Sequence, residues 1–225
     1  MPHLALKICG CDDWIKENKE ASISEAYIRA TQSILDLIDV SQEHAINYLT
    51  INLFRVDEII KYEVAEQMKI YSIFISFFMD TIDELAESRK YKLRFIGDFL
   101  SLPSELLEII SKLNAKTLNN KGMMIIFALN YSSSNEITCA INSLIKTKFM
   151  VSDFSPIKAE ELEAHLSMPN IPSPNLLVYT KKEQVLDDWL PYQAKKSHVL
   201  FYDKFFPDLD REDFYKMLGH LSNKW

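Results

Sequence analysis

The chain contains six short apolar segments that are rich in β-branched and aromatic side chains. They are residues 3–8, 48–54, 92–96, 123–129, 176–179 and 199–201. These segments lack the regular alternation of polar and apolar positions that a strand with one face in water would show. We therefore expect six strands that are buried on both faces.

The stretches between these segments carry apolar residues at helical spacing. They are residues 24–38, 57–87, 104–118, 134–145 and 211–221. Helices that alternate with buried strands form crossover connections between parallel strands. The chain has only four glycines, with no repeat or low-complexity tract that would indicate a linker. The pattern thus predicts a single α/β domain over residues 1–225, with a mostly parallel central sheet and helices on both faces.

The expected helix at residues 57–87 is unusual because its apolar residues occupy more than one stripe. Phe74, Phe77 and Phe78 lie in its most apolar part. A helix that is apolar on several sides must be buried on several sides. On pattern alone, we expect a central core helix.

Composition narrows the class of protein further. A net charge of −7 and a sequence pI near 5.3 argue against a nucleic-acid partner, which would require a basic face. An odd number of cysteines without a secretory signal pattern indicates the reducing cytoplasm. Cys9 and Cys11 are too few thiols for a tetrahedral metal site, so we expect Cys9 to be a buried structural residue. The most apolar run, residues 70–79, is roughly half of what spans a bilayer, which predicts no transmembrane segment and leaves only peripheral membrane contact open.

Three blocks of residues together match the scaffold pattern of one enzyme family. They are Tyr48-Leu-Thr50 with Phe54, Ile96-Gly-Asp98 with Leu102-Pro103, and Ala128-Leu-Asn-Tyr131. In these blocks, and in register from His3 to about Asp213, the chain resembles the cis-prenyltransferases, the undecaprenyl-diphosphate-synthase-like enzymes that extend isoprenoid diphosphates. The resemblance implies their fold, an isoprenoid diphosphate ligand, and a hydrophobic tunnel along the helix at 57–87. In such a tunnel Phe74, Phe77 and Phe78 would favour a chain of about ten to twenty carbons, because they fill space.

The loop after the first strand differs from the family pattern. The family's Asp-Gly-Asn-x-Arg-Trp falls on residues 9–14, where Gly10 and Trp14 are kept. The Asp that handles magnesium is replaced by Cys9, and the phosphate-binding Arg by Asp13. Gly10 and Trp14 stay candidates for substrate binding, but chain elongation by the family mechanism is not expected.

Two further substrate loops have lost their family residues as well. After the second strand, the family's Phe-Ser-x-x-Asn-Trp falls on residues 54–59, where Arg55 replaces the serine, and Lys61 stands in for a nearby arginine. The family block that binds the second diphosphate with two arginines falls on residues 179–187, where Lys181 and Lys182 supply the positive charge. These four cations are the candidate phosphate ligands.

Acidic residues accumulate at or beside the same loops, which should converge at the carboxyl ends of the strands. Neighbouring carboxylates repel one another unless a divalent cation joins them, so the sequence predicts a Mg²⁺ site. Its candidate ligands are Asp12, Asp13, Glu17, Asp187 and Asp188. The candidate catalytic residues are Asp12, Asp13, Asp187 and His198, the last falling where the family has a magnesium-binding Glu. The alternative is that each Asp-Asp pair only caps the start of a helix.

Two functions are consistent with these residues. The first is a diverged enzyme that ionises an isoprenoid diphosphate through Mg²⁺ and cyclises or rearranges it, with a logic similar to that of terpene synthases. The alternative is a noncatalytic partner subunit of a heterodimeric cis-prenyltransferase, although the family's C-terminal Arg-x-Gly signature is absent from this sequence. A carrier that uses only the tunnel is a third. The resemblance implies a homodimer or a heterodimer with a related subunit.

Overall fold

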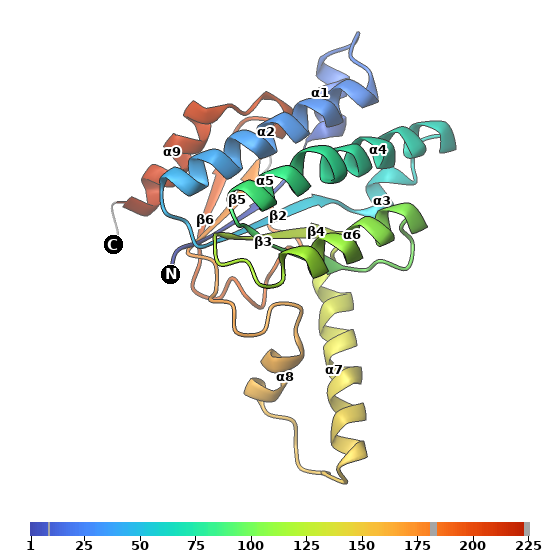
Figure 1. The fold of residues 1–225 in the computed structure, drawn as a ribbon, viewed down its shortest axis with the longest axis vertical. Coiled ribbons are helices and arrows are strands. Elements are labelled where there is room, and N and C mark those ends of the chain that lie inside the picture. Colours follow the sequence, from blue (N-terminus) through green and yellow to red (C-terminus); the bar gives the residue numbers. More distant parts are fainter. Residues whose placement is uncertain (9, 181–183, 223–225) are drawn as a thin grey trace.

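The structure is a computed structural model that describes residues 1–8, 10–180 and 184–222. The described residues form a six-stranded parallel sheet in the order β3-β4-β2-β1-β5-β6 (Figure 1). The strands are β1 (His3–Lys7), β2 (Tyr48–Phe54), β3 (Lys92–Gly97), β4 (Met124–Leu129), β5 (Leu176–Thr180) and β6 (His198–Tyr202). All six predicted strands and the parallel sheet are confirmed.

The helices follow the predicted segments, with several additions. They are α1 (Cys11–Glu17), α2 (Ile23–Glu43), α3 (Val56–Ile59), α4 (Val64–Ser76), α5 (Asp83–Ser88), α6 (Ser104–Thr117), α7 (Ser133–Met150), α8 (Ala159–His165) and α9 (Arg211–Ser222). A π-helical turn, η1 (Phe77–Ile82), joins α4 to α5, and a 3₁₀ turn, η2 (Phe206–Asp208), precedes α9. Helices α1 and α8 were not predicted, because seven residues are too few for a helical period to stand out.

The predicted single helix at 57–87 is wrong in one respect, because the chain leaves the helix after Ile59 and resumes it at Val64. The side chain of Gln67 stabilises this break. Its Nε2 donates to the carbonyl of Tyr62 at 2.8 Å and to that of Ile60 at 3.4 Å. Carbonyls at a helix end need partners from outside the helix, and one amide side chain supplies them here. The break turns residues 60–63 toward the carboxyl end of the sheet.

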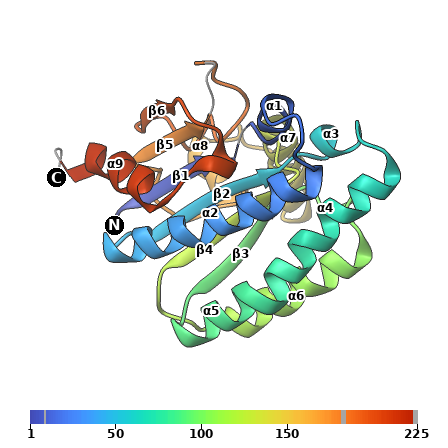
Figure 2. The same cartoon turned by 90° about the horizontal axis from the view of Figure 1, so that it is seen from above.

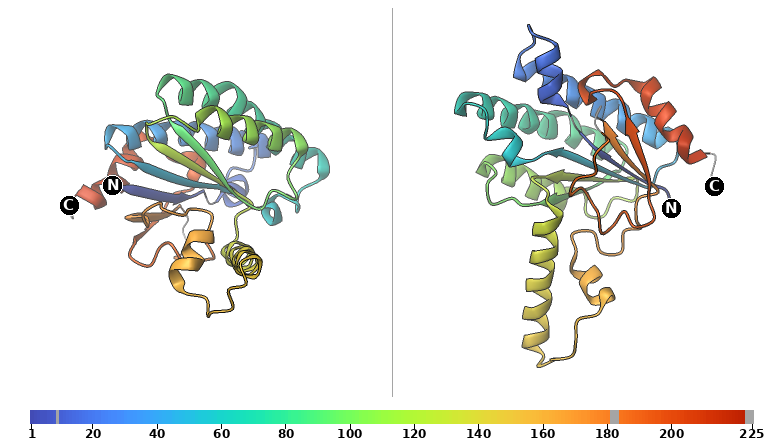
Figure 3. Two further views of the ribbon diagram at one scale, coloured as in Figure 1. Left: turned by 60° about the horizontal axis from the view of Figure 1, so that its bottom comes forward. Right: turned by 180° about the vertical axis from the view of Figure 1, so that it is seen from behind.

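The two faces of the sheet are covered differently. Helices α2, α4, α5, α6 and α9 lie on one face, over the larger hydrophobic core (Figures 1 and 2). The second face carries a smaller core that includes Met168, Trp189 and Leu190 from the connections around β5. Helices α7 and α8 lie on this side, and α7 runs away from the sheet (Figure 3). No helix in the described ranges is both long and apolar enough to cross a membrane.

Aromatic rings fill the space between α4, η1 and the sheet. The ring of Phe74 lies 5.0 Å from that of Phe54 and 6.5 Å from that of Phe78, between centroids. Phe78 in turn lies 5.2 Å from both Phe95 and Phe127. Rings at these distances are in contact and leave no room for a prenyl chain between them.

Candidate functional site

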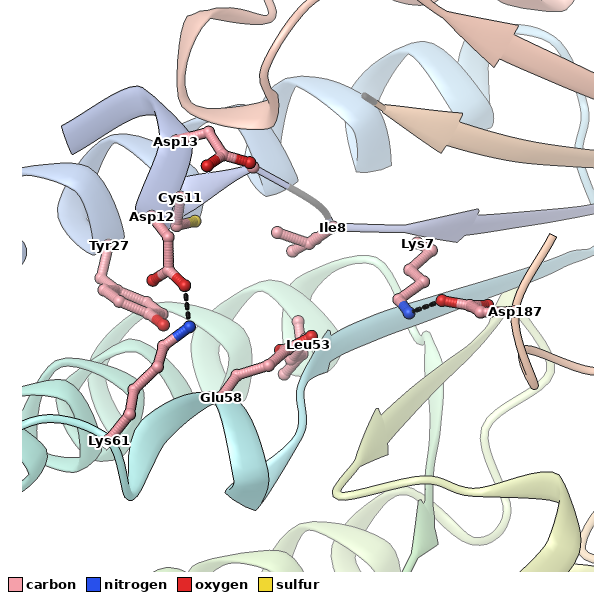
Figure 4. Close-up of a pocket in the computed structure, with 11 residues that line it drawn as sticks. Lys7, Ile8, Cys11, Asp12, Asp13, Tyr27, Leu53, Glu58, Lys61 and Asp187 are labelled. Atoms are coloured by element: carbon pink, nitrogen blue, oxygen red, sulfur yellow. Dashed lines mark hydrogen bonds and ion pairs between the residues drawn. The ribbon is translucent and has the colours of Figure 1, made fainter. Parts of the chain in front are cut away.

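A cavity of about 300 Å³ opens at the carboxyl ends of β1 and β2, where parallel sheets commonly bind ligands (Figure 4). It is lined by Lys7, Ile8, Gly10, Cys11, Asp12, Asp13, Tyr27, Leu53, Glu58, Lys61 and Asp187. The structure therefore brings together five of the predicted site residues, from segments far apart in the sequence: Gly10, Asp12, Asp13, Lys61 and Asp187.

Gly10 sets the path of the loop that follows β1. Its φ is +85°, and a Cβ added there would lie 2.5 Å from Cδ1 of Phe205. Only glycine adopts this backbone conformation without strain and also leaves space for the ring. The Gly10 carbonyl accepts the backbone N–H of Trp14 at 2.8 Å, which starts α1. The loop thus places Cys11 and Asp12 on the cavity wall.

Trp14 does not line this cavity. It is 3% exposed, and its Nε1 donates to a carboxylate oxygen of Asp208 at 2.7 Å. The guanidinium of Arg29 lies over the indole, 5.3 Å from its centroid. Trp14 therefore connects α1 to α2 and η2, and it stabilises the position of α1 without contacting the cavity.

Asp12 forms an ion pair with Lys61 at one end of the cavity (Figure 4). The hydroxyl of Tyr62 donates to the other oxygen of the same carboxylate. Burial, followed by the hydrogen bond to Asp12, raises the pKa of Tyr62, so that the hydroxyl stays a donor. Lys61 and Tyr62 both lie in the break between α3 and α4, which explains why that break matters for the site.

Lys7 forms an ion pair with Asp187 at the other end of the cavity (Figure 4). The lysine is the last residue of β1, and its side chain is only 8% exposed. The second oxygen of Asp187 accepts the backbone N–H of Trp189 at 3.1 Å. A buried ammonium group needs such a partner, because an unpaired charge in this position would be costly.

Arg55 is the third cation at the strand ends. Its Nη1 donates to Asp188 at 2.7 Å, while Nε and Nη2 hold Asp57 at 2.9 and 3.1 Å. The hydrogen bonds to Asp57 are the main reason that the pKa of Arg55 is raised above its usual value. Glu58 accepts the Arg55 backbone N–H at 3.1 Å, and burial raises the pKa of this carboxyl.

The remaining predicted residues lie elsewhere. Glu17 borders a separate surface hollow beside Asn18 and Arg29. His198 is exposed on the edge strand β6 and does not line the cavity. The side chains of Phe74, Phe77 and Phe78 belong to the packed aromatic cluster behind the cavity wall. Lys181 and Lys182 lie outside the described residues.

Comparison with known proteins agrees with this geometry. Residues 10–224 match the family described as "Putative undecaprenyl diphosphate synthase". The chain belongs to the cis-prenyltransferase family. Among its relatives, an "Isoprenyl transferase" of Staphylococcus saprophyticus is 29% identical over 94% of this chain and 82% of its own length. The "Ditrans,polycis-undecaprenyl-diphosphate synthase ((2E,6E)-farnesyl-diphosphate specific)" of Micrococcus luteus is 27% identical over 99% of this chain and 88% of its own.

A solved structure is also similar along nearly the whole chain. Lavandulyl diphosphate synthase from Lavandula x intermedia, in complex with dimethylallyl diphosphate, superposes with a TM-score of 0.90 and is 25% identical. The match covers 99% of this cis-prenyltransferase family member and 95% of the plant enzyme. The predicted family and fold are therefore confirmed.

The described acids of this family member are not grouped as a metal site would require. We expected the carboxylates to repel one another unless Mg²⁺ bridged them, but Asp12, Asp187 and Asp188 each face a lysine or arginine. Asp13 points its carboxylate at Lys16 on the surface, at 2.7 Å. Within the described ranges, no three His, Cys, Asp or Glu side chains are placed to hold a metal ion. The residues present do not by themselves fit Mg²⁺, and its binding stays a prediction.

Several residues that line or support the cavity were not predicted from the sequence. Lys7 had one available signal, because it is a lysine at the carboxyl end of an otherwise apolar strand. Tyr27, which lines the cavity, and Tyr62, which bonds to Asp12, had none, because an aromatic residue in a helical pattern is indistinguishable from a core residue. Burial raises the pKa of Tyr27, which keeps its hydroxyl protonated at the cavity wall.

Proposed function

We propose that this cis-prenyltransferase family member binds a short allylic prenyl diphosphate in the cavity at the ends of β1 and β2 and ionises it there. One observation carries the proposal. The cavity joins two ammonium groups, those of the buried Lys7 and of Lys61, whose side chain is 47% exposed, to an apolar wall that includes Ile8 and Leu53. A prenyl diphosphate combines the same two chemistries, a polyanionic head and a hydrocarbon tail.

The diphosphate would lie between the two lysines, with Arg55 beside them. Ammonium and guanidinium groups that are partly shielded from water bind phosphate oxygens more strongly than fully exposed ones do. A guanidinium can also bind two phosphate oxygens at once. These cations take the place of the arginines that the family pattern uses.

The packed rings behind the cavity limit the prenyl tail of the ligand to a short length. Tyr27, on the cavity wall, is in ring contact with Phe74 at 6.0 Å, and Phe74 is in contact with Phe54 and Phe78. A cavity of about 300 Å³ is at the lower end of the usual range for small-molecule sites. The structural likeness to lavandulyl diphosphate synthase, crystallised with dimethylallyl diphosphate, supports a ligand of similar size.

The proposed reaction begins with heterolysis of the allylic C–O bond, whose electron pair leaves with the diphosphate. Lys7 and Lys61 stabilise the charge that develops on the leaving group. The aromatic face of Tyr27 stabilises the allylic cation that remains. This cation then either loses a proton to the released diphosphate or is captured by the π bond of a second prenyl unit, and the new cation loses its proton to the same diphosphate.

The test measures diphosphate release from dimethylallyl, geranyl and farnesyl diphosphate by the purified protein. We expect release with the shorter substrates, and a fall of at least about 100-fold in Lys7→Met and Lys61→Met, the scale of losing one electrostatic contact to a transition state. Lys116→Met is the matched control, because Lys116 pairs with Asp83 and Glu87 away from the cavity. The absence of both release and binding with all three substrates would refute the proposal.

A second function is favoured by the same ion pairs. Because Asp12, Asp187 and Asp188 neutralise the cations at the strand ends, the chain is also suited to be a noncatalytic subunit of a heterodimer. Exposed apolar side chains at the far end of α7 and just after it, among them Phe149, Met150, Val151 and Phe154, give a partner or a second copy of this chain a surface to cover. For this function, mixing with a second cis-prenyltransferase should give a stable complex whose turnover exceeds that of the partner alone.

A further inference from the structure

Two adjacent carboxylates, Asp187 and Asp188, pair with cations at the carboxyl ends of two other strands. Asp187 pairs with Lys7 at the end of β1, and Asp188 pairs with Arg55 directly after β2. Asp187 lines the cavity, and Asp188 follows it directly in the chain; both side chains are about 30% exposed. The double pairing places negative charge at the positions where an anionic ligand would meet these cations.

Buried residues hold these acids in place. Trp189 and Leu190, which follow directly, are 1% and 0% exposed. The indole of Trp189 packs edge-on against the ring of Tyr131, with 5.2 Å between the two centroids. The backbone N–H of Trp189 donates to Asp187. The carboxylates are thus fixed by the core of the second face, which keeps them beside the cations at little further loss of conformational entropy.

We propose that Asp187 and Asp188 act as an internal anion that occupies Lys7 and Arg55 and sets the charge that a ligand must carry. The inference rests on the proposed function, since it concerns the same phosphate site. A ligand has to replace two carboxylates, so a singly charged carboxylate, or a monophosphate that reaches only one of the two cations, would separate two ion pairs and re-form only one. A diphosphate, with about two to three negative charges and several oxygens, can satisfy both cations at once.

The two acids are therefore specificity-determining residues. They select diphosphates over monophosphates and carboxylates, which are abundant competitors for any exposed lysine or arginine. A binding site can reject weakly matched ligands by making them break an existing interaction, which here is an ion pair.

The experiment compares binding of inorganic pyrophosphate and inorganic phosphate by titration calorimetry, in EDTA and at fixed ionic strength. The proteins are the unmodified chain, Asp187→Asn, Asp188→Asn and the control Asp39→Asn. Asp39 pairs with Arg89 and Arg211 near the C-terminal end of α2, away from the cavity, so that its change removes the same charge at a distance. Thermal melting establishes that each variant is folded, and either cavity variant alone is sufficient for the test.

We expect the unmodified chain to bind pyrophosphate at least tenfold more tightly than phosphate. Asp187→Asn or Asp188→Asn should tighten phosphate binding by about tenfold, which is about 1.4 kcal/mol, and so narrow the selectivity. Asp39→Asn should change neither affinity. If a folded cavity variant binds phosphate no more tightly than the unmodified chain, the inference is overturned while the proposed function stands. If only the cavity variants bind pyrophosphate, the internal anion is supported and the proposed function fails. If no protein binds pyrophosphate, either in EDTA or with Mg²⁺ in its place, both fail.

Discussion

Phe74 is the residue that most directly limits the length of the ligand. It stands behind the cavity wall, in ring contact with Tyr27, Phe54 and Phe78, and it is 1% exposed. Phe74→Ala should extend the cavity toward the sheet. Because three aromatic neighbours surround the site and cannot collapse into it easily, the loss of stability should be about 4 kcal/mol. For a chain of this size, that corresponds to a fall in Tm of about 8–16 °C.

The assay compares affinities for geranylgeranyl and dimethylallyl diphosphate. In Phe74→Ala the ratio should shift by at least tenfold toward the longer ligand. Phe214→Ala is the matched control, because Phe214 is equally buried, but on α9, where its ring contacts Phe206. It should lose similar stability without any change in the ratio. If Phe74→Ala shifts the affinity ratio no more than Phe214→Ala does, Phe74 does not limit chain length and the proposed size of the ligand is wrong.

Three further changes test the site and its support. Gly10→Ala forces a left-handed conformation on alanine and a clash with Phe205. It should lower the free energy of unfolding by about 1–3 kcal/mol and weaken pyrophosphate binding. A melting temperature and an affinity equal to those of the unmodified chain would contradict the role of this loop. Adding EDTA should change pyrophosphate affinity less than about twofold, because lysine and arginine hold the anion; a loss of binding that Mg²⁺ restores would instead support the predicted metal. Burial lowers the pKa of His3 from 6.5 to about 4, so the unfolded chain takes up its proton first as the pH falls. Stability from neutral His3 should be complete above about pH 6.5 and decline by about 3 kcal/mol as the pH falls to about 4, a loss that urea unfolding detects and that His3→Gln should reduce.

The sequence pattern predicted the sheet well, because buried parallel strands such as Ile125 to Leu129 are apolar without interruption and few other structures need that pattern. It placed Asp12, Asp13 and Asp187 at one cavity for the same reason, since all three follow or lie beside the carboxyl ends of strands. It did not show which charges meet. The pairing of Lys7 with Asp187 joins residues 180 positions apart, and no periodic pattern in the sequence relates two residues at that separation.

The break between α3 and α4 also lay beyond sequence reasoning. Residues 60–63 contain no proline or glycine, and the turn depends on Gln67, whose amide binds carbonyls seven and five residues earlier. A polar residue on a helix face gives no sign of such a contact. The prediction of one continuous helix therefore failed at the point that presents Lys61 to the cavity and Tyr62 to Asp12.

The π-helical turn η1 holds one more residue than an α-helical turn would in the same place. This part of the chain can therefore lose a residue without losing the helix. Deletion of Met79, which is 50% exposed there, should convert the turn to regular α-helix and leave the aromatic cluster on one side and α5 on the other nearly in register. A deletion within α4 itself would instead rotate every following side chain by about 100°, so natural length variation in this helix should be confined to Phe77–Ile82.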